Sequence, residues 1–301
     1  DVFTGRRTPV ARAPVRRAHF ATDNASAERF ALGRGVDNVS KLYHRAGDGT
    51  DWVLVNDESV THRVEVPLGF AADNRTAYLQ VEQPNGPDAV VAYDTASGER
   101  KDVFRSANVD PAATVSTIGA RNVPVGVFLA DGRWSTAFFD DGSPEARLYR
   151  SLEAAFPGES VSITSSTDDG RLVLVSVDSD RNPGDFYLFD TQAKKVDFLL
   201  ARRQWFKPES MAEQKPIRLK SRDGMDLHGY LTLPKAGSGK RPMIVLPHGG
   251  PFTVRDYWGF DNDPQMLAAA GYAVLQVNFR GSSGYGRRFN QAGAQQVGGA
   301  M

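Results

Sequence analysis

The stretch PMIVLPHGGPFTVRDYWGF, residues 242–260, predicts the fold of the last third of this chain. An apolar run at 243–247 is typical of a strand, and it leads directly into the tetrapeptide HGGP at 248–251. Glycine has no Cβ, so two glycines at the end of a strand leave the main chain uncovered. We therefore expect another group to approach the backbone closely at this loop.

The segments around this loop predict an α/β domain. Upstream, residues 216–235 form two alternating runs joined at Asp223-Gly224, which indicates a β-hairpin. Downstream, a helical segment is followed by a second continuous apolar run at 272–279. Continuous apolar strands on either side of a helix predict a buried parallel βαβ unit.

The expected helix between the two apolar strands has recognisable ends. Asn262 or Asp263 can cap its N-terminus, and Pro264 fits its first turn. Gly271 suits the left-handed residue that commonly ends a helix. The order hairpin, strand, HGGP, helix and strand is that of the N-terminal part of an α/β-hydrolase fold, which we assign to residues 206–301.

The preceding part of the chain has a different texture. Short runs rich in β-branched and aromatic residues alternate with turns containing Gly, Asp, Asn or Pro, which is typical of strands. The clearest of these runs are DWVLVN (51–56), TAYLQVEQ (76–83), DAVVAYD (88–94), RLVLVSVD (171–178) and DFYLFD (185–190). We therefore expect an all-β domain over residues 1–205.

A repeat runs through this all-β segment. The turn residues Asp73, Asp131 and Asp169 are separated by 58 and 38 residues, on average 48, and Asp94 and Asp190 are separated by 96, twice that average. A strand-only period of this size is that of one β-propeller blade, so the segment predicts a partial propeller of about four blades. A β-sandwich with irregular loops is the alternative.

Composition narrows the classes of partner and cofactor. The chain has 36 basic and 36 acidic residues, so no overall charge attracts nucleic acid or an anionic membrane. No apolar run approaches the ~18 to 20 residues that span a bilayer. The chain has no cysteine, which excludes disulfides, thiol nucleophiles and cysteine-ligated zinc. We predict no cofactor, no nucleic-acid partner and no membrane partner.

Three interpretations of HGGP compete. Phosphate binding requires glycines that open a helix directly after the strand, whereas Pro251 removes an amide donor and the helix starts a dozen residues later. Metal binding by His248 lacks a second histidine at helical spacing. The third is an oxyanion hole, in which the bare backbone donates an N–H to a substrate carbonyl oxygen that becomes negatively charged. The sequence favours this third interpretation.

The motifs VLPHGGP and GYAVLQVNFRGSSGYGRRF (271–289) resemble those of the prolyl oligopeptidase family of serine peptidases. Within it, they are most similar to the bacterial dipeptidyl-aminopeptidase and acylaminoacyl-peptidase group. The resemblance is specific over about 216–301 and only architectural over 40–205. It implies a β-propeller followed by an α/β-hydrolase domain, acting on short peptides by an acyl-enzyme mechanism, with the propeller as a size filter.

The resemblance also implies roles for single residues. Gly249 would supply an oxyanion-hole amide. His248, Gly250 and Pro251 would hold the shape of the loop. The residues that it places at or beside the substrate are His248, Gly250, Asn278, Arg280 and Tyr285. The alternative is that Arg280 only ties two loops together and that the glycines of GSSGYG (281–286) serve a turn.

The nucleophile and its partners are expected outside these residues. No G-x-S-x-G elbow occurs in the chain, and GSSGYG does not have that spacing. We therefore expect the 301 residues to be part of a longer enzyme and inactive alone. The strand at 243–247 would then lie at the edge of its sheet, where it can associate with the rest of the catalytic domain or with a second copy.

Three functions follow from these observations. The first is a serine peptidase that takes peptides as substrates. The second is an esterase of the same fold, and the third is a non-catalytic binding module based on the propeller. The HGGP loop favours an enzyme, because a binding module explains the repeat but not the loop.

Overall fold

The computed structural model describes residues 2–235 and 239–301. The chain divides into two compact units, Asp1–Gln83 with Ala89–Arg105, and Pro84–Asp88 with Ser106–Met301. This division falls inside the segment that the sequence assigns to the propeller. The boundary near residue 205 stays a prediction.

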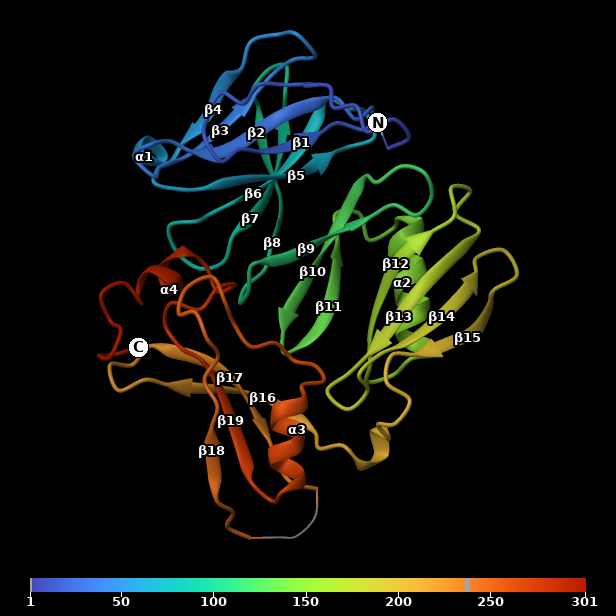
Figure 1. Ribbon diagram of the computed structural model, residues 1–301, viewed down its shortest axis with the longest axis vertical. Coiled ribbons are helices and arrows are strands. Elements are labelled where there is room, and N and C mark those ends of the chain that lie inside the picture. The colour runs from blue at the N-terminus through green and yellow to red at the C-terminus, as the bar shows by residue number, and fades with distance from the viewer. Residues whose placement is uncertain (1, 236–238) are drawn as a thin grey trace. The chain divides into compact units, whose positions relative to one another are not determined.

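The first unit contains two antiparallel four-stranded sheets, each with its strands in chain order (Figure 1). The first sheet comprises β1 (His19–Thr22), β2 (Glu28–Arg34), β3 (Ser40–His44) and β4 (Val53–Asp57), and the short helix α1 (Glu58–Thr61) follows it. The second comprises β5 (Glu65–Phe70), β6 (Thr76–Val81), β7 (Ala89–Asp94) and β8 (Arg100–Arg105). Alternating apolar side chains from both sheets, among them Phe30, Leu42, Phe70 and Leu79, form one buried cluster.

The second unit begins with two more antiparallel sheets. One has three strands, β9 (Pro111–Ser116), β10 (Pro124–Asp131) and β11 (Arg133–Phe138). The other comprises β12 (Ser160–Ser166), β13 (Leu172–Asp178), β14 (Asp185–Asp190) and β15 (Lys195–Ala201). Between them the chain forms helix α2 (Pro144–Ala155).

The predicted period is confirmed. The second strands of the four antiparallel sheets begin at Glu28, Thr76, Pro124 and Leu172, each 48 residues after the one before. All five strand predictions quoted above also fall on strands of the structure, namely β4, β6, β7, β13 and β14.

One of the residues that led to this period does not have the predicted position. Asp73 and Asp169 lie in turns between a first and a second strand. The Asp73 carboxylate accepts two backbone N–H groups of its turn, and the Asp169 carboxylate accepts one. Asp131 instead ends the second strand β10, so it is not their equivalent. The average of 48 was correct because the two unequal separations, 58 and 38, add up to two whole periods.

The expectation of strands alone is wrong at α2. Ser143 accepts a hydrogen bond from the Ala146 N–H at 3.1 Å, and Pro144 occupies the first helical turn, so the helix has a regular N-terminus. The helix buries Leu152 among the apolar side chains of β12 and β13. It follows the three-stranded sheet at the point where the other antiparallel sheets have a fourth strand.

The last sheet is mixed and has the order β16-β17-β19-β18. The hairpin β16 (Gln214–Lys220) and β17 (Asp226–Thr232) is antiparallel, as predicted, and follows the short 3₁₀ helix η1 (Pro208–Ser210). Strand β18 (Met243–Val245) pairs in parallel with β19 (Ala273–Asn278), and α3 (Asn262–Ala269) connects them. The predicted parallel βαβ unit is therefore confirmed, and β18 is at the sheet edge.

Two details of this unit differ from the expectation. The N-cap of α3 is Asp261, which accepts from the Asp263 N–H, rather than Asn262 or Asp263. Strand β18 is only three residues long, and the side chains of Met243 and Val245 are each 56% exposed. It is not the buried strand that its apolar sequence predicts, because within the described residues β18 pairs on one side only.

The last helix in the described residues is the short α4 (Arg287–Gln291), whose Phe289 packs with Tyr285 and Val109 in a small buried cluster. None of the helices in the described part of the chain is long and apolar enough to cross a membrane.

Candidate functional site

The HGGP loop follows the edge strand β18, and His248 fixes its shape. The His248 ring stacks on Phe279, with ring centroids 4.4 Å apart. Its Nδ1 is 2.7 Å from the carbonyl oxygen of Gly249, and its Nε2 is 2.8 Å from Ser282 Oγ. A carbonyl oxygen only accepts, so Nδ1 carries the proton and, in the neutral ring, Nε2 accepts from the Ser282 hydroxyl. Both ring nitrogens are thus used within the chain, as expected for a structural histidine.

Gly249 presents its backbone to solvent. The residue is exposed, and a Cβ built on it would meet nothing within 4 Å. Among residues 2–235 and 239–301, its N–H donates no hydrogen bond. An exposed amide without a partner can donate to a ligand oxygen, which is the property that an oxyanion hole requires.

Gly250 and Pro251 shape the turn after this amide. Gly250 has φ +128°, a backbone conformation that favours glycine, and its Cβ would lie 3.2 Å from the Phe252 nitrogen. The Gly250-Pro251 peptide bond is cis. Their role in holding the loop stays a prediction.

The loop after β19 contains a buried network centred on Tyr285. Its hydroxyl oxygen accepts from Asn278 Nδ2 and from Arg255 Nη2, both at 2.8 Å. The guanidinium of Arg255 also lies 4.2 Å from the centre of the Tyr285 ring and donates to the carbonyl oxygen of Ala130 at 2.8 Å. The role of Arg255, within RDYW (255–258), could not be predicted from the sequence, because its acceptor at Ala130 is distant in the sequence.

Asn278 is fully buried and its amide is completely used inside the chain. Its Oδ1 accepts from the Asp256 N–H at 2.7 Å, and its Nδ2 donates to the Asp256 carbonyl and to Tyr285. Gly284 leaves the room for this network, because a Cβ there would lie 2.3 Å from Arg255 Nη1. Contact of Asn278 or Tyr285 with a substrate stays a prediction.

Arg280 connects the same loop to the hairpin turn between β16 and β17. Its Nη2 donates to both carboxylate oxygens of Asp223, at 2.6 and 2.8 Å. Hydrogen bonds from Arg280 and Ser221 hold the pKa of Asp223 well below its usual range. Arg280 itself is 7% exposed, and its Nε is buried with no partner in the described residues. The loop-tying role that the sequence left as an alternative is therefore present.

Two further groups near this network have shifted pKa values. Burial, with a smaller contribution from Arg218, lowers the pKa of His228 to about 4, and its ring stacks on Tyr285 at 4.1 Å. Burial raises the pKa of Asp256, whose Oδ2 has no partner among the described residues. Asp256 borders a cavity of about 400 Å³ that Arg202, Arg203 and Tyr257 also line. Neither group has a sequence motif of its own.

A metal centre is not indicated in the part of the chain that the structure describes. Within it, no group of three or more His, Asp or Glu side chains is placed to hold a metal ion. The main chain at Gly249 can instead donate a hydrogen bond to a ligand.

Comparison with known proteins identifies relatives of this arrangement. Residues 258–301 match the prolyl oligopeptidase family. The chain is 30% identical over its whole length to dipeptidyl aminopeptidase BIII of Pseudoxanthomonas mexicana, of which it covers 44%. Over 68 residues, 21% of the chain and 9% of the relative, it is 43% identical to the acylamino-acid-releasing enzyme of Homo sapiens. The chain thus spans less than half the length of these curated relatives.

Solved structures share the fold at low sequence identity. A puromycin-hydrolyzing peptidase of Mycobacterium tuberculosis superposes with a TM-score of 0.70 at 17% identity, covering 98% of this chain and 47% of that one. The acylaminoacyl peptidase of Pyrococcus horikoshii gives a TM-score of 0.57 at 20% identity, covering 95% and 43%. The arrangement of separate antiparallel sheets before a mixed sheet is therefore that of known peptidases.

Proposed function

We propose that this chain belongs to the prolyl oligopeptidase family, which residues 258–301 match, and that the whole protein is a serine peptidase that cleaves short peptides through an acyl-enzyme. The observation that carries this proposal is the exposed Gly249 amide, which has no acceptor in the described part of the chain. The names of the relatives, an aminopeptidase and an acylamino-acid-releasing enzyme, support hydrolysis at the end of a peptide.

In this proposal Gly249 donates its N–H to the carbonyl oxygen of the scissile bond. Negative charge gathers on that oxygen as the serine attacks, and a donor already aimed at it lowers the barrier without reorganisation. His248 acts on the loop and not on the substrate, because its two nitrogens bond to Gly249 and Ser282. The network of Asn278, Arg255 and Tyr285 holds the neighbouring loop in place.

We further propose that the antiparallel sheets are blades of a partial β-propeller and that residues 206–301 are the N-terminal part of an α/β-hydrolase domain. The 48-residue spacing of the second strands supports the blades. The parallel β18-α3-β19 unit behind the HGGP loop supports the hydrolase. These residues alone would not hydrolyse peptides, because they contain no G-x-S-x-G elbow.

A serine-reactive fluorophosphonate probe tests the proposal on the whole protein. We expect covalent labelling of one serine and loss of peptidase activity in proportion to it. Turnover of an aminoacyl-nitroanilide should exceed that of a nitrophenyl ester, whereas the opposite preference would indicate the esterase. Absence of labelling, together with no turnover of either substrate, would contradict an enzyme of this type.

A further inference from the structure

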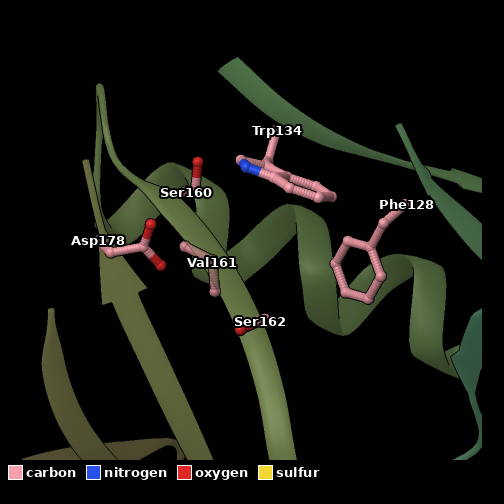
Figure 2. A pocket seen from close by; sticks show the side chains of 6 residues that line it. All are labelled: Phe128, Trp134, Ser160, Val161, Ser162 and Asp178. Carbon is pink, nitrogen blue, oxygen red and sulfur yellow. The ribbon is translucent and has the colours of Figure 1, made fainter. Parts of the chain in front are cut away.

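A cavity of about 320 Å³ lies in the second unit between the third and the fourth antiparallel sheet. Phe128 of β10 and Trp134 of β11 are on one side of it, and Ser160, Val161, Ser162 and Asp178 of β12 and β13 are on the other (Figure 2). Its volume is within the range of about 300 to 1,000 Å³ that small-molecule sites occupy. None of these six residues belongs to the HGGP loop or to the network around Tyr285.

Two polar groups on one wall have no partner among the described residues. Ser160 is 6% exposed, and its Oγ, buried from solvent, has no hydrogen-bond partner among the described residues. The carboxylate of Asp178 likewise has neither an ion pair nor a hydrogen bond within residues 2–235 and 239–301. Buried polar atoms are nearly always paired in proteins, so the unpaired Ser160 Oγ at the cavity wall points to a ligand. The carboxylate of Asp178, which lies opposite Ser160 in the register of β12 and β13, is half-buried and free to pair with the same ligand.

Two carboxylates, those of Asp178 and Glu159, lie near this wall together with the guanidinium of Arg202. Burial raises the pKa of Asp178, and the charge of Arg202 opposes that rise without forming an ion pair. Burial also raises the pKa of Glu159, and the nearby charge of Asp178 adds to it, so a second carboxylate is close. A cation is the ligand that fits this wall, because burial disfavours the charged carboxylate of Asp178 and a neighbouring positive charge stabilises it.

The opposite wall selects the kind of cation. Trp134 and Phe128 present aromatic rings, and one face of the Trp134 ring stacks on Tyr257 at 5.4 Å. Aromatic rings attract organic cations electrostatically and also pack against their apolar parts. A metal ion is a poor fit, since no group of three ligating side chains occurs in the described part of the chain.

We propose that this cavity is a binding site for a small organic ammonium ion with an apolar body. The ammonium group donates to the Asp178 carboxylate and to Ser160 Oγ, and the apolar body lies against Trp134 and Phe128. The site is separate from the proposed catalytic loop, and its occupation involves no bond cleavage.

Titration of the purified whole protein with benzylammonium chloride, followed by calorimetry and by tryptophan fluorescence, tests this proposal. We expect saturable binding of one equivalent, and no binding of the neutral benzyl alcohol. Asp178→Asn should weaken binding by roughly 10- to 100-fold, the range for losing a hydrogen bond between charged groups. Trp134→Leu should weaken it by roughly 2- to 30-fold through the lost cation–π contact.

Matched variants separate the site from general effects. Asp197 lies on β15 of the same sheet with its side chain 60% exposed, and Trp205 is 75% exposed, so Asp197→Asn and Trp205→Leu should bind like the unmodified protein. Equal binding of benzyl alcohol, or unchanged affinity in Asp178→Asn, would overturn the proposal. Because the titration contains no peptide substrate, its result does not depend on the proposed peptidase activity.

Discussion

The loops that follow β18 and β19 use their polar groups in opposite ways. Both loops leave the sheet at the same end, because the two strands are parallel neighbours. In the first loop Gly249 is exposed and its N–H has no acceptor in the described residues. In contrast, Asn278 at the end of β19 and Tyr285 of the second loop are buried and hydrogen-bonded to each other. The first arrangement leaves a donor for a ligand, and the second supports its surroundings.

The position of each strand in the sheet explains this difference. Strand β19 has β17 on one side and β18 on the other, so the loop that continues it is surrounded by protein. Strand β18 has a neighbour on one side only in the described residues, and the loop after it remains open to solvent. The HGGP loop and the GSSGYG loop resemble the same family, but the first is open to solvent and the second is packed within the protein.

The largest expected effect is on turnover, from Gly249→Pro. Proline has no amide hydrogen, so this variant removes the proposed oxyanion donor. We expect kcat of the whole protein for an aminoacyl-nitroanilide to fall by about 10²- to 10³-fold with little change in KM.

Gly249→Ala is the matched control for this prediction. It keeps the N–H, and its added Cβ meets nothing within 4 Å, so we expect the thermal stability and most of the turnover to remain. Equal turnover of the proline and alanine variants would show that the Gly249 amide does not stabilise the transition state. The two loops would then differ in exposure but not in function.

A smaller effect, on stability, is expected from Tyr285→Phe. The change leaves the Asn278 and Arg255 donors without their shared acceptor, which costs about 1 to 3 kcal/mol of unfolding free energy. Chemical denaturation measures this loss. Tyr257→Phe is the control, because that side chain is 44% exposed and its hydroxyl has no partner in the described residues, so we expect a change within about 0.5 kcal/mol. A Tyr285→Phe protein of full stability with a raised KM would instead place Tyr285 at the substrate.

Features that depend on local pattern could be predicted from the sequence. The turns between strands recur every 48 residues, and the apolar runs at 243–247 and 272–279 identify the two parallel strands. The HGGP loop identified the exposed amide for a related reason, since two adjacent glycines after a strand are a local signal.

Features that depend on distant partners could not be predicted. The acceptor of Arg255 is the Ala130 carbonyl, 125 residues earlier, and no spacing in the sequence connects them. The position of Asp131 between the second and third strands of its sheet could not be predicted either. An acidic residue has the same local sequence signal in this turn as in the turn between the first and second strands. Helix α2 had a readable cap at Ser143-Pro144, but the surrounding repeat of strands outweighed it.

His228→Phe tests the buried loop through pH. The pKa of His228 is about 4 in the folded protein, so the unfolded chain, with an ordinary pKa of about 6.5, binds the proton first as the pH falls. Stability is therefore lost between about pH 6.5 and pH 4. The phenylalanine ring keeps the stack on Tyr285 and removes this loss, so the variant's unfolding free energy should vary less with pH. His44, whose pKa is also about 4, is common to both proteins and cancels in the difference. Identical pH dependence would mean that His228 becomes protonated without cost.

The smallest effect is expected from Asp223→Asn, because the Asp223 side chain is 55% exposed. Its pKa is lowered in the folded protein by Arg280, so the carboxylate contributes stability above its ordinary value of about 3.9 and loses it as the pH falls further. Thermal unfolding should therefore separate the variant from the unmodified protein at pH 7 and progressively less below pH 4. Asp226→Asn is the control, because Asp226 pairs with Lys220 in the same hairpin and both side chains are 67% exposed, so it should change stability less.

The Asp223→Asn variant also tests whether Arg280 contacts the substrate or only supports the loop after β19. Arg280, in the buried loop after β19, keeps an unpaired donor, its Nε, within the described residues. If Arg280 only ties the loops together, releasing it from Asp223 changes stability and leaves KM for the peptide unchanged. If KM rises while stability holds, Arg280 needs its present orientation to meet the substrate. Arg280 would then bind the substrate, as is proposed for Gly249, although it lies after β19 among residues that support the loop.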